Sequence, residues 1–193
     1  MFEVFKSNPA ETLLKEDHRK VEKLFAQFDQ ASTRREKKKI VQDALTELKI
    51  HAAIEEEIFY PAVRKPVGKV IMTEADEEHH VAKLLIAELD SMDGSESHFD
   101  AKFIVLAENV RHHIKEEENE MLPKARSVKV DFQALADKML ARKEKLLADG
   151  VPPVGEEKMV KRSRGQGDSP ARAAKRKPKA VSRSQRAVSR KSK

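Results

Sequence analysis

The sequence contains no cysteine, no tryptophan and only one tyrosine among its 193 residues. The absence of cysteine excludes disulfides, thiolate-bound zinc and iron–sulfur clusters, so histidine and the carboxylates are the strong metal ligands that remain. No run of about 18 apolar residues is present, and the N-terminal residues contain no apolar segment of signal-peptide length. These absences predict a soluble, cytoplasmic protein without a membrane segment.

Charge is unevenly distributed along the chain. Residues 1–150 carry 25 basic and 30 acidic side chains, a net charge of −5, whereas residues 151–193 carry 14 basic and 3 acidic side chains, a net charge of +11. A chain of this length accommodates one domain of ordinary size with a sizeable core. We therefore divide the sequence into a folded domain, residues 1–150, and a basic tail, residues 151–193.

Apolar residues in the first part recur at alternating steps of three and four, which is the period of an amphipathic helix, and four long helices are predicted. Their core-facing stripes are Leu14, His18, Val21, Phe25 and Phe28; Ile40 or Val41, Ala44, Leu48, His51, Glu55 and Ile58 or Phe59; Met72, Ala75, His79, Ala82, Ile86 and Leu89; and Phe99, Phe103, Leu106, Val110, His113, Glu117 and Met121. Pro61 and Pro66 are expected to weaken the end of the second helix. A shorter amphipathic segment, from Phe132 to about Leu147, is a candidate fifth helix outside the other four.

The first pair of helices resembles the second at an offset of 61 to 62 residues. His18 aligns with His79, and residues 51–55 align with residues 113–117. A helical hairpin that is used twice, with short connections, builds an antiparallel four-helix bundle. The sequence therefore predicts an all-α fold: an up-down-up-down four-helix bundle, a candidate short fifth helix and a disordered basic tail.

One triplet of residues occurs twice, in HAAIEEEIFYP at 51–61 and in HIKEEENEMLP at 113–123. Each stretch has His, then Glu four residues later, then Pro six residues beyond the Glu. Residues four apart lie on one helix face with Cβ atoms about 5–6 Å apart, so each His and Glu can bind the same ion. His-x-x-x-Glu alone is a weak signal, because the EEE runs at 55–57 and 116–118 produce it by chance.

If all four stripes face the bundle axis, four imidazoles and two carboxylates converge in a dry cavity. Burying unpaired carboxylates is costly, and a cation offsets that cost. A single buried histidine usually donates to a backbone carbonyl, but four at equivalent places, two of them with Glu at i+4, indicate metal binding. The predicted metal ligands are His18, His51, Glu55, His79, His113 and Glu117.

This series of histidines and glutamates, with each Glu leading into a Pro, resembles the hemerythrin-like family, the HHE cation-binding domains. The resemblance covers roughly residues 8–127, and EEHHVAKLLIAEL and VRHHIKEEENEMLPKAR are particularly similar to that family's third and fourth helices. It implies a four-helix bundle that holds two iron ions without haem, with the four histidines as terminal ligands and Glu55 and Glu117 as bridges. Oxygen, peroxide or nitric oxide chemistry, or iron sensing, is the implied use. Manganese and zinc suit the same nitrogen and oxygen ligands.

Oxygen-carrying members of that family use five histidine ligands, whereas only four match here. His112 is the nearest candidate for a fifth, but it lies about 100° round the helix from His113, toward a neighbouring helix. The missing nitrogen ligand argues against reversible oxygen carriage and leaves a position for water, peroxide or another anion. His80 and His98 are interpreted as surface residues, and Tyr60 as a packing residue.

The tail, residues 151–193, has no Phe, Tyr, Leu, Ile or Trp, so it cannot bury enough apolar surface to fold by itself and is predicted to be disordered. The runs KRSR at 161–164 and KRKPK at 175–179 favour phosphate backbones without base reading, since no aromatic side chain is available for stacking. One interpretation is non-specific DNA or RNA binding, with a nucleoid-associated location. The other is a solubilising tail without a dedicated partner.

Three functional hypotheses follow. In the first, the protein binds or senses a small diatomic ligand, peroxide or iron, in the context of oxidative stress, and its tail tethers it to nucleic acid. In the second, it is a di-iron enzyme that consumes peroxide or oxygen, like a catalase or an oxidase. In the third, the bundle is metal-free and the tail carries the function.

Overall fold

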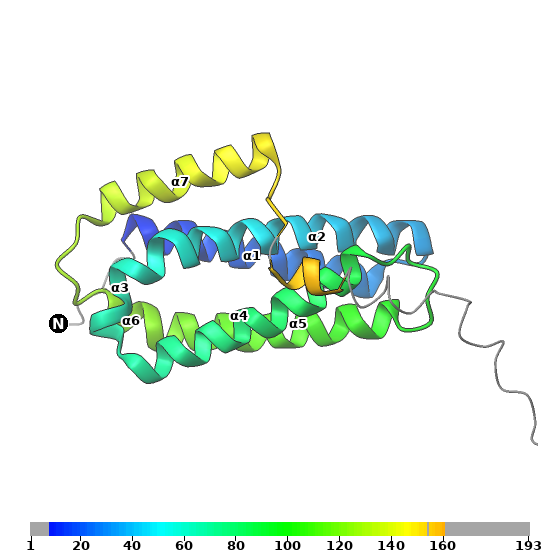
Figure 1. The fold of residues 1–193 in the computed structure, drawn as a ribbon, viewed down its shortest axis with the longest axis horizontal. Helices are drawn as coiled ribbons and strands as arrows, with labels where there is room; N and C mark the ends of the chain where they lie inside the picture. Colours follow the sequence, from blue (N-terminus) through cyan, green and yellow to red (C-terminus); the bar gives the residue numbers. More distant parts are fainter. Residues whose placement is uncertain (1–7, 154, 161–193) are drawn as a thin grey trace, which may run out of the picture.

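The computed structural model describes residues 8–153 and 155–160, and every regular element in these ranges is a helix (Figure 1). Four long helices lie side by side: α1 (Pro9–Gln30), α2 (Arg34–Ile54), α4 (Lys69–Asp90) and α5 (Phe99–Glu116). Their connections are short, three residues between α1 and α2 and eight between α4 and α5, which favours antiparallel neighbours. The all-α bundle confirms the predicted fold class.

Two of the four helices continue beyond the bundle centre through a π-helical turn. The chain passes from α2 through η1 (Glu55–Phe59) into α3 (Tyr60–Val67), and from α5 through η2 (Glu117–Met121) into α6 (Leu122–Ala125). Each π-helical turn begins at the glutamate of one repeated triplet. In each turn a backbone N–H donates to the carbonyl five residues back, from Tyr60 to Glu55 and from Leu122 to Glu117.

These turns explain the proline of each triplet. Proline lacks an N–H, and in an α-helix its ring clashes with the carbonyl four residues back. The wider π-helical turn directly before Pro61 and Pro123 relieves this conflict by adding one residue to the helix. Helix α3 therefore continues past Pro61 and contains Pro66, and it ends at Gly68, whose φ of 101° suits glycine. The expectation that these prolines weaken the second helix is wrong in this respect.

A layer of polar residues divides the apolar core into two clusters. One cluster lies at the end of the bundle formed by α3 and α6 and includes Leu14, Ile54, Phe59, Met72 and Met121. The other lies toward the opposite end and includes Phe25, Phe28, Val41, Phe103 and Leu106. Along α1, α2 and α4, the predicted histidine falls between a residue of one cluster and a residue of the other, and His113 falls between Val110 of α5 and Met121 of η2. The core therefore surrounds the predicted metal ligands on both sides.

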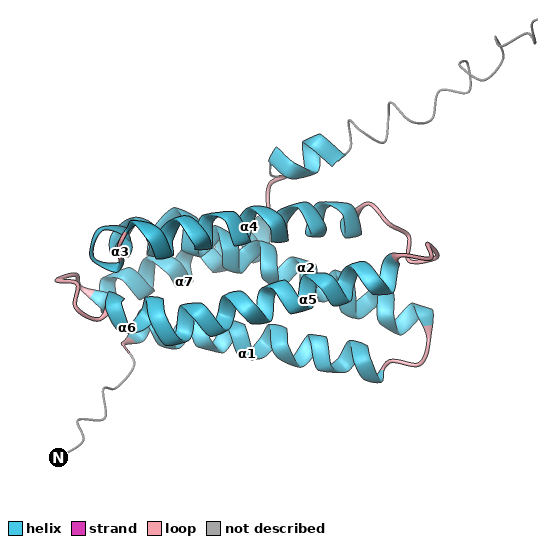
Figure 2. Ribbon diagram, turned by 90° about the horizontal axis from the view of Figure 1, so that it is seen from below, coloured by secondary structure: helices cyan, strands magenta, loops and turns pink. Residues whose placement is uncertain are grey.

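Two further helices pack outside the bundle. The expected fifth helix is present as α7 (Phe132–Asp149), which lies against α1 and α2. Residues 155–160 form a short helix beside α4 (Figure 2), where Glu156 pairs with His80 and the buried Glu157 pairs with Lys49. The predicted disorder is wrong for these six residues, because ion pairs and the burial of Val160 hold them on the bundle. The remainder of the predicted tail, residues 161–193, lies outside the described residues.

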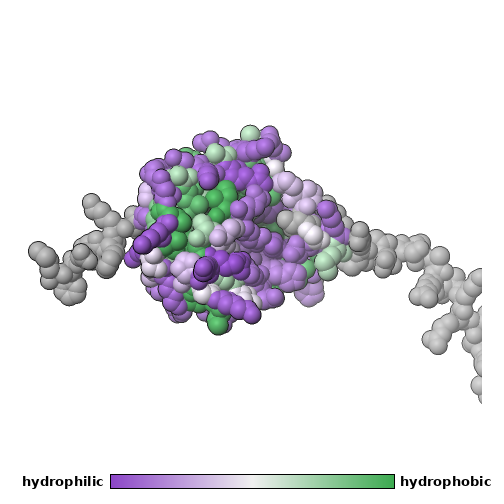
Figure 3. Space-filling model, turned by 60° about the vertical axis from the view of Figure 1, so that its left-hand side comes forward, coloured by the Kyte–Doolittle hydropathy of each residue, from purple (hydrophilic) through white to green (hydrophobic). Residues whose placement is uncertain are grey.

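The surface of the bundle is mainly hydrophilic, with hydrophobic side chains gathered in one area of the face drawn in Figure 3. Within the described ranges, none of the helices has the length and apolar character needed to cross a membrane.

Candidate metal centre

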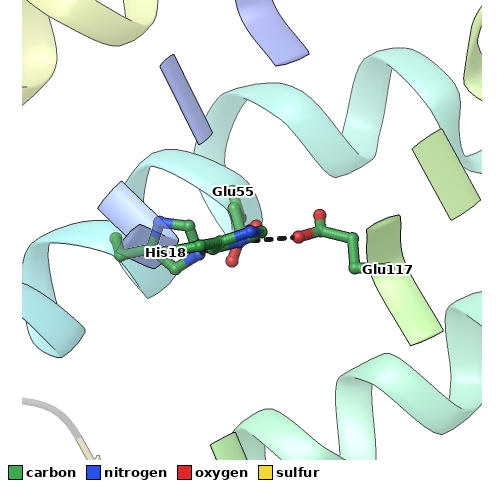
Figure 4. A group of neighbouring side chains, drawn as sticks. His18, Glu55 and Glu117 are labelled. Carbon is green, nitrogen blue, oxygen red and sulfur yellow. Dashed lines mark hydrogen bonds and ion pairs between the residues drawn. The ribbon is translucent and has the colours of Figure 1, made fainter. Parts of the chain in front are cut away.

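All six predicted ligands are buried in the polar layer. Each long helix contributes one histidine: His18 from α1, His51 from α2, His79 from α4 and His113 from α5. Glu55 and Glu117 stand at the first positions of the two π-helical turns, and Figure 4 shows both carboxylates approaching the ring of His18. The antiparallel arrangement of four helices therefore brings together residues that are up to 99 positions apart in the chain.

The imidazole Nε2 atoms face inward in two pairs. The Nε2 atoms of His18 and His51 are 3.2 Å apart, and those of His79 and His113 are also 3.2 Å apart. Two ligand atoms that each lie about 2.1 Å from one ion, at an angle of about 90–120°, are about 3.0–3.6 Å apart. Each pair of histidines therefore has the spacing of two ligands of one ion.

The two carboxylates join these pairs into two ligand groups, which share one residue. The first group is His18, His51, Glu55 and Glu117, and the second is Glu55, His79 and His113. Glu55 places Oε1 3.2 Å from Nε2 of His51 and Oε2 3.3 Å from Nε2 of His79, so it faces both groups. Glu117 belongs to the first group, with Oε2 3.0 Å from Nε2 of His18.

An outer carboxylate stands behind each histidine. The Nδ1 atoms of His18, His79 and His113 lie 2.8, 2.9 and 2.8 Å from carboxylate oxygens of Glu118, Glu56 and Glu78, and Asp17 lies 3.7 Å from Nδ1 of His51. An ionised carboxylate only accepts hydrogen bonds, so the proton in the three short contacts is on Nδ1. In His18, His79 and His113, Nε2 then presents its lone pair to the interior, which is the orientation that a metal-binding histidine needs.

The inward-facing Nε2 atoms and the two buried carboxylates together test whether a cation fits between them. Neither oxygen of Glu55 or of Glu117 has a hydrogen-bond partner among the described residues, and both side chains are buried. Neutral imidazoles would turn lone pairs toward these carboxylates, so acceptors would face acceptors in the core. A cation between them, either a metal ion or a second proton on the imidazoles, removes the conflict. The donor set fits a metal centre.

In the metal-free protein, protons on the histidines supply this positive charge. Burial by itself lowers the pKa of His51, but Glu55, Asp17 and Glu117 outweigh burial and raise this pKa to about 10. Burial also opposes the charged form of His79, but Glu55 and Glu56 raise the pKa of this histidine to about 9. Burial raises the pKa of Glu55, whereas His51 and His79 lower it more, so the pKa is well below its ordinary value. Glu117 has a raised pKa because it is buried and because Glu55 is nearby.

The single tyrosine is a fully buried core residue, as sequence reasoning expected, and its hydroxyl also reaches the second group. The hydroxyl of Tyr60 lies 3.1 Å from Nε2 of His79 and 3.4 Å from Nε2 of His113. Burial and the charge of Glu55 raise the pKa of this phenol well above its ordinary value. An α-helical turn would place residue 59 beneath Glu55, but the additional residue of η1 brings Tyr60 to the site. The proline of the triplet was the one available signal for this shift.

The three other histidines lie outside both groups. His80, His98 and His112 are exposed, as interpreted for the first two. The ring of His112 is 62% exposed and faces Glu78 and Glu116 rather than the bundle axis, so it does not provide a fifth nitrogen to the inner groups.

A small cavity of about 40 Å³ adjoins the four inner histidines. Most of its other lining residues are apolar, among them Val21, Leu48, Ile86, Val110 and Ile114, and Asp17, Glu78, Lys83 and Asn109 also contribute to the lining. This volume has room for a molecule the size of about two or three waters. A small uncharged molecule can therefore occupy a largely apolar space directly beside the ring nitrogens.

Comparisons with known proteins agree with this geometry. The family model described as "Hemerythrin HHE cation binding domain" matches residues 10–125, a range that contains all six predicted ligands. A crystal structure of a hemerythrin HHE cation binding domain-containing protein from Mycobacterium kansasii is similar with a TM-score of 0.62 and 25% identity, over 84% of this chain and 95% of that chain.

A DNA nickase from Nostoc sp. (strain PCC 7120 / SAG 25.82 / UTEX 2576) is 27% identical over 115 residues. The match covers 60% of this chain but 33% of the nickase, so it spans about a third of the length of this curated relative.

Metal binding is expected to release protons. Without metal at pH 7.5, His51 and His79 are protonated, because the pKa values of about 10 and 9 lie above this pH. Ligation requires neutral imidazoles, so binding should release about two protons per chain from these residues and should tighten as the pH rises toward 9. Calorimetric titration of the metal-free protein in buffers of different ionisation enthalpy measures the number of protons. Binding without proton release at pH 7.5 would contradict the protonated state described above.

Proposed function

Because the chain belongs to the hemerythrin HHE cation binding domain family and is therefore a metal-binding protein, we propose that it holds two metal ions in the two ligand groups. His18, His51 and Glu117 would bind the first ion, His79 and His113 the second, and Glu55 both. The observation that supports this assignment is the pair of buried carboxylates without hydrogen-bond partners between inward-facing imidazoles. We assign the folded domain to residues 1–150 and the tail to the residues that follow.

We propose iron as the physiological metal. A set of four imidazoles and two carboxylates contains nitrogen and oxygen ligands only, which suit iron, manganese and zinc. Iron is the choice that the hemerythrin resemblance implies, since two iron ions supply the redox chemistry that oxygen and peroxide require. The protein's own contribution is to orient the imidazoles through Glu118, Glu56 and Glu78, and to exclude bulk water by the apolar clusters on both sides.

The proposed role is binding or sensing of a small molecule, either a diatomic gas or peroxide, under oxidative stress in the cytoplasm. The small apolar cavity beside the histidines limits the ligand to a few atoms. The second group offers three ligand residues where the first offers four, so the second ion has more room for an external ligand. The hydroxyl of Tyr60 can donate a hydrogen bond to a ligand held there.

A second candidate is an enzyme that consumes peroxide, favoured by the position of Tyr60. A phenol with a strongly raised pKa keeps its proton, so Tyr60 can donate a hydrogen bond to a peroxide oxygen next to the second group. Disproportionation of two peroxide molecules to one oxygen and two waters needs no further reductant, so the reaction is chemically complete.

The tail is proposed to bind duplex nucleic acid without reading its sequence. Residues 161–193 carry 13 basic side chains and one acidic side chain. Nucleic acid presents about one phosphate charge per 1.7 Å of duplex and is a much stronger attractor than the weakly acidic bundle. The similarity to a DNA nickase is compatible with a protein that works near DNA. A nucleoid-associated location follows from this proposal.

Elemental analysis tests the metal assignment. After reconstitution with iron(II) in the absence of oxygen, the whole chain should contain about two iron ions, and the double variant His51→Ala, His113→Ala should contain fewer than about one, because each group loses a nitrogen ligand. The matched control is His80→Ala, His98→Ala, which removes two exposed histidines and should retain full occupancy. Equal iron content in both double variants would refute the assignment.

Peroxide consumption separates binding from catalysis. For a sensor, we expect one spectral change per chain and then a rate of peroxide loss no greater than that of free iron at equal concentration. An enzyme should instead sustain turnover in the usual range of about 1–1000 per second. A sustained rate in that range that falls in Tyr60→Phe would reject the sensor and establish the enzyme.

Truncation tests the tail. Removal of residues 161–193 leaves the packed helix at 155–160 intact and should abolish duplex binding, whereas His51→Ala, His113→Ala should leave it unchanged. Binding by the whole chain should weaken steeply with salt, because released counterions drive it. Fluorescence anisotropy with duplexes of unrelated sequence measures both effects. If the truncated chain bound duplex as tightly as the whole chain at the same salt concentration, the tail would not be the binding element.

A further inference from the structure

The outer carboxylates behind the four inner histidines differ in how they are neutralised. Three of them contact a basic side chain: Glu118 pairs with Arg19 at 2.6 Å, Glu56 with Lys83 at 2.9 Å, and Asp17 with Lys143. Glu78, which accepts from His113 at 2.8 Å, contacts no lysine or arginine among the described residues. The fourth position therefore lacks the fixed positive charge that the other three have.

A histidine and a second carboxylate occupy the place of that base. Nε2 of His112 lies 3.6 Å from Oε1 of Glu78 and 3.1 Å from Oε1 of Glu116. Glu116 likewise contacts no lysine or arginine in the described ranges. Two carboxylates thus share one imidazole without a lysine or arginine, whereas each of the other three outer carboxylates contacts a basic side chain.

The three ligand atoms have the spacing of a metal site. They lie within 4.8 Å of one another, and the two distances from His112, 3.1 and 3.6 Å, are those expected for neighbouring ligands of one ion. The longer distance exceeds that of a hydrogen bond, so a direct bond does not account for the approach of Glu78. His112 and Glu116 also repeat the His-x-x-x-Glu spacing of the inner ligands, one residue before His113 and Glu117.

We propose that Glu78, His112 and Glu116 form an outer cation site for a divalent transition metal ion on the surface between α4 and α5. One imidazole nitrogen and two carboxylate oxygens suit manganese(II), iron(II) or zinc. Solvent reaches the site, because the side chains of His112 and Glu116 are 62% and 43% exposed, so waters can complete the coordination and the ion can exchange.

The outer ion would supply the positive charge that Arg19, Lys83 and Lys143 supply behind the other histidines. Glu78 contacts both the proposed outer site and the buried second group, since Oε1 faces His112 and Oε2 accepts from Nδ1 of His113. One carboxylate thus separates an exchangeable surface ion from a histidine of the buried second group.

An ordinary surface ion pair of the same chemistry is available for comparison. His80 lies 3.0 Å from Glu156, and within the described part of the chain it has no other carboxylate partner and belongs to no group of three ligand residues. Replacement of His80 therefore removes an exposed histidine and one ion pair without changing the proposed site.

Manganese(II) is the probe for the outer site, because the free ion is counted directly by electron paramagnetic resonance. The whole chain, with its iron content first fixed by elemental analysis, should bind one further manganese(II) per chain. Glu116→Gln and His112→Ala should each weaken this binding at least about tenfold, since each removes one of three ligands, and His80→Ala should leave it unchanged. The iron content should be the same in all variants.

Two results would overturn the proposal: no further manganese(II) bound by the wild-type chain, or undiminished binding in Glu116→Gln. Either would mean that His112 makes surface ion pairs only. If the inner groups do not retain iron, the same titration of the metal-free chain still decides the question, because wild type and Glu116→Gln should then differ by one manganese(II) ion. Failure of the proposed function and failure of the outer site are therefore distinguishable.

Discussion

Two carboxylates, those of Glu55 and Glu117, are buried at the middle of an apolar bundle, and the rest of the structure is arranged to accommodate them. Four imidazoles surround the carboxylates, and neither carboxylate has a hydrogen-bond partner among the described residues. Buried charge without compensation would destabilise the fold by several kcal/mol per group. A cation in the polar layer is thus a structural requirement before it is a functional one, whether protons or metal ions provide it.

The compensation extends outward in alternating layers of charge. Inner carboxylates face imidazoles, and outer carboxylates stand behind the imidazoles. His18 and His79 donate to Glu118 and Glu56, which contact Arg19 and Lys83. Asp17, 3.7 Å from Nδ1 of His51, contacts Lys143. Lys143 lies on α7, so the helix outside the bundle takes part in holding Asp17 behind His51. Within the described ranges, Glu78 is the exception among the outer carboxylates. It faces His112, which also pairs with Glu116, instead of a lysine or arginine. The proposed outer site follows from this exception to an otherwise regular pattern.

The sequence predicted the helices and the burial of the six proposed ligands, because both depend on periodicity. Each histidine interrupts an apolar stripe at a position where only a core residue is expected, so its burial followed from the stripe. The outer carboxylates were not predictable in the same way, since Glu56 and Glu118 stand in Glu-rich runs whose members look alike. Tyr60 was assigned to packing and is a core residue, but its approach to His79 was not predictable, because the π-helical turn changes the register that an α-helical period gives. The helix at 155–160 depends on pairing with Lys49 and His80, contacts that composition does not reveal.

The most direct test of a centre with two ions is anomalous X-ray scattering at the iron edge from crystals of the iron-loaded chain. The account predicts two peaks within the polar layer, one next to Nε2 of His18 and His51, the other next to Nε2 of His79 and His113, with Glu55 between them. A single peak, or peaks away from these nitrogen atoms, would contradict it.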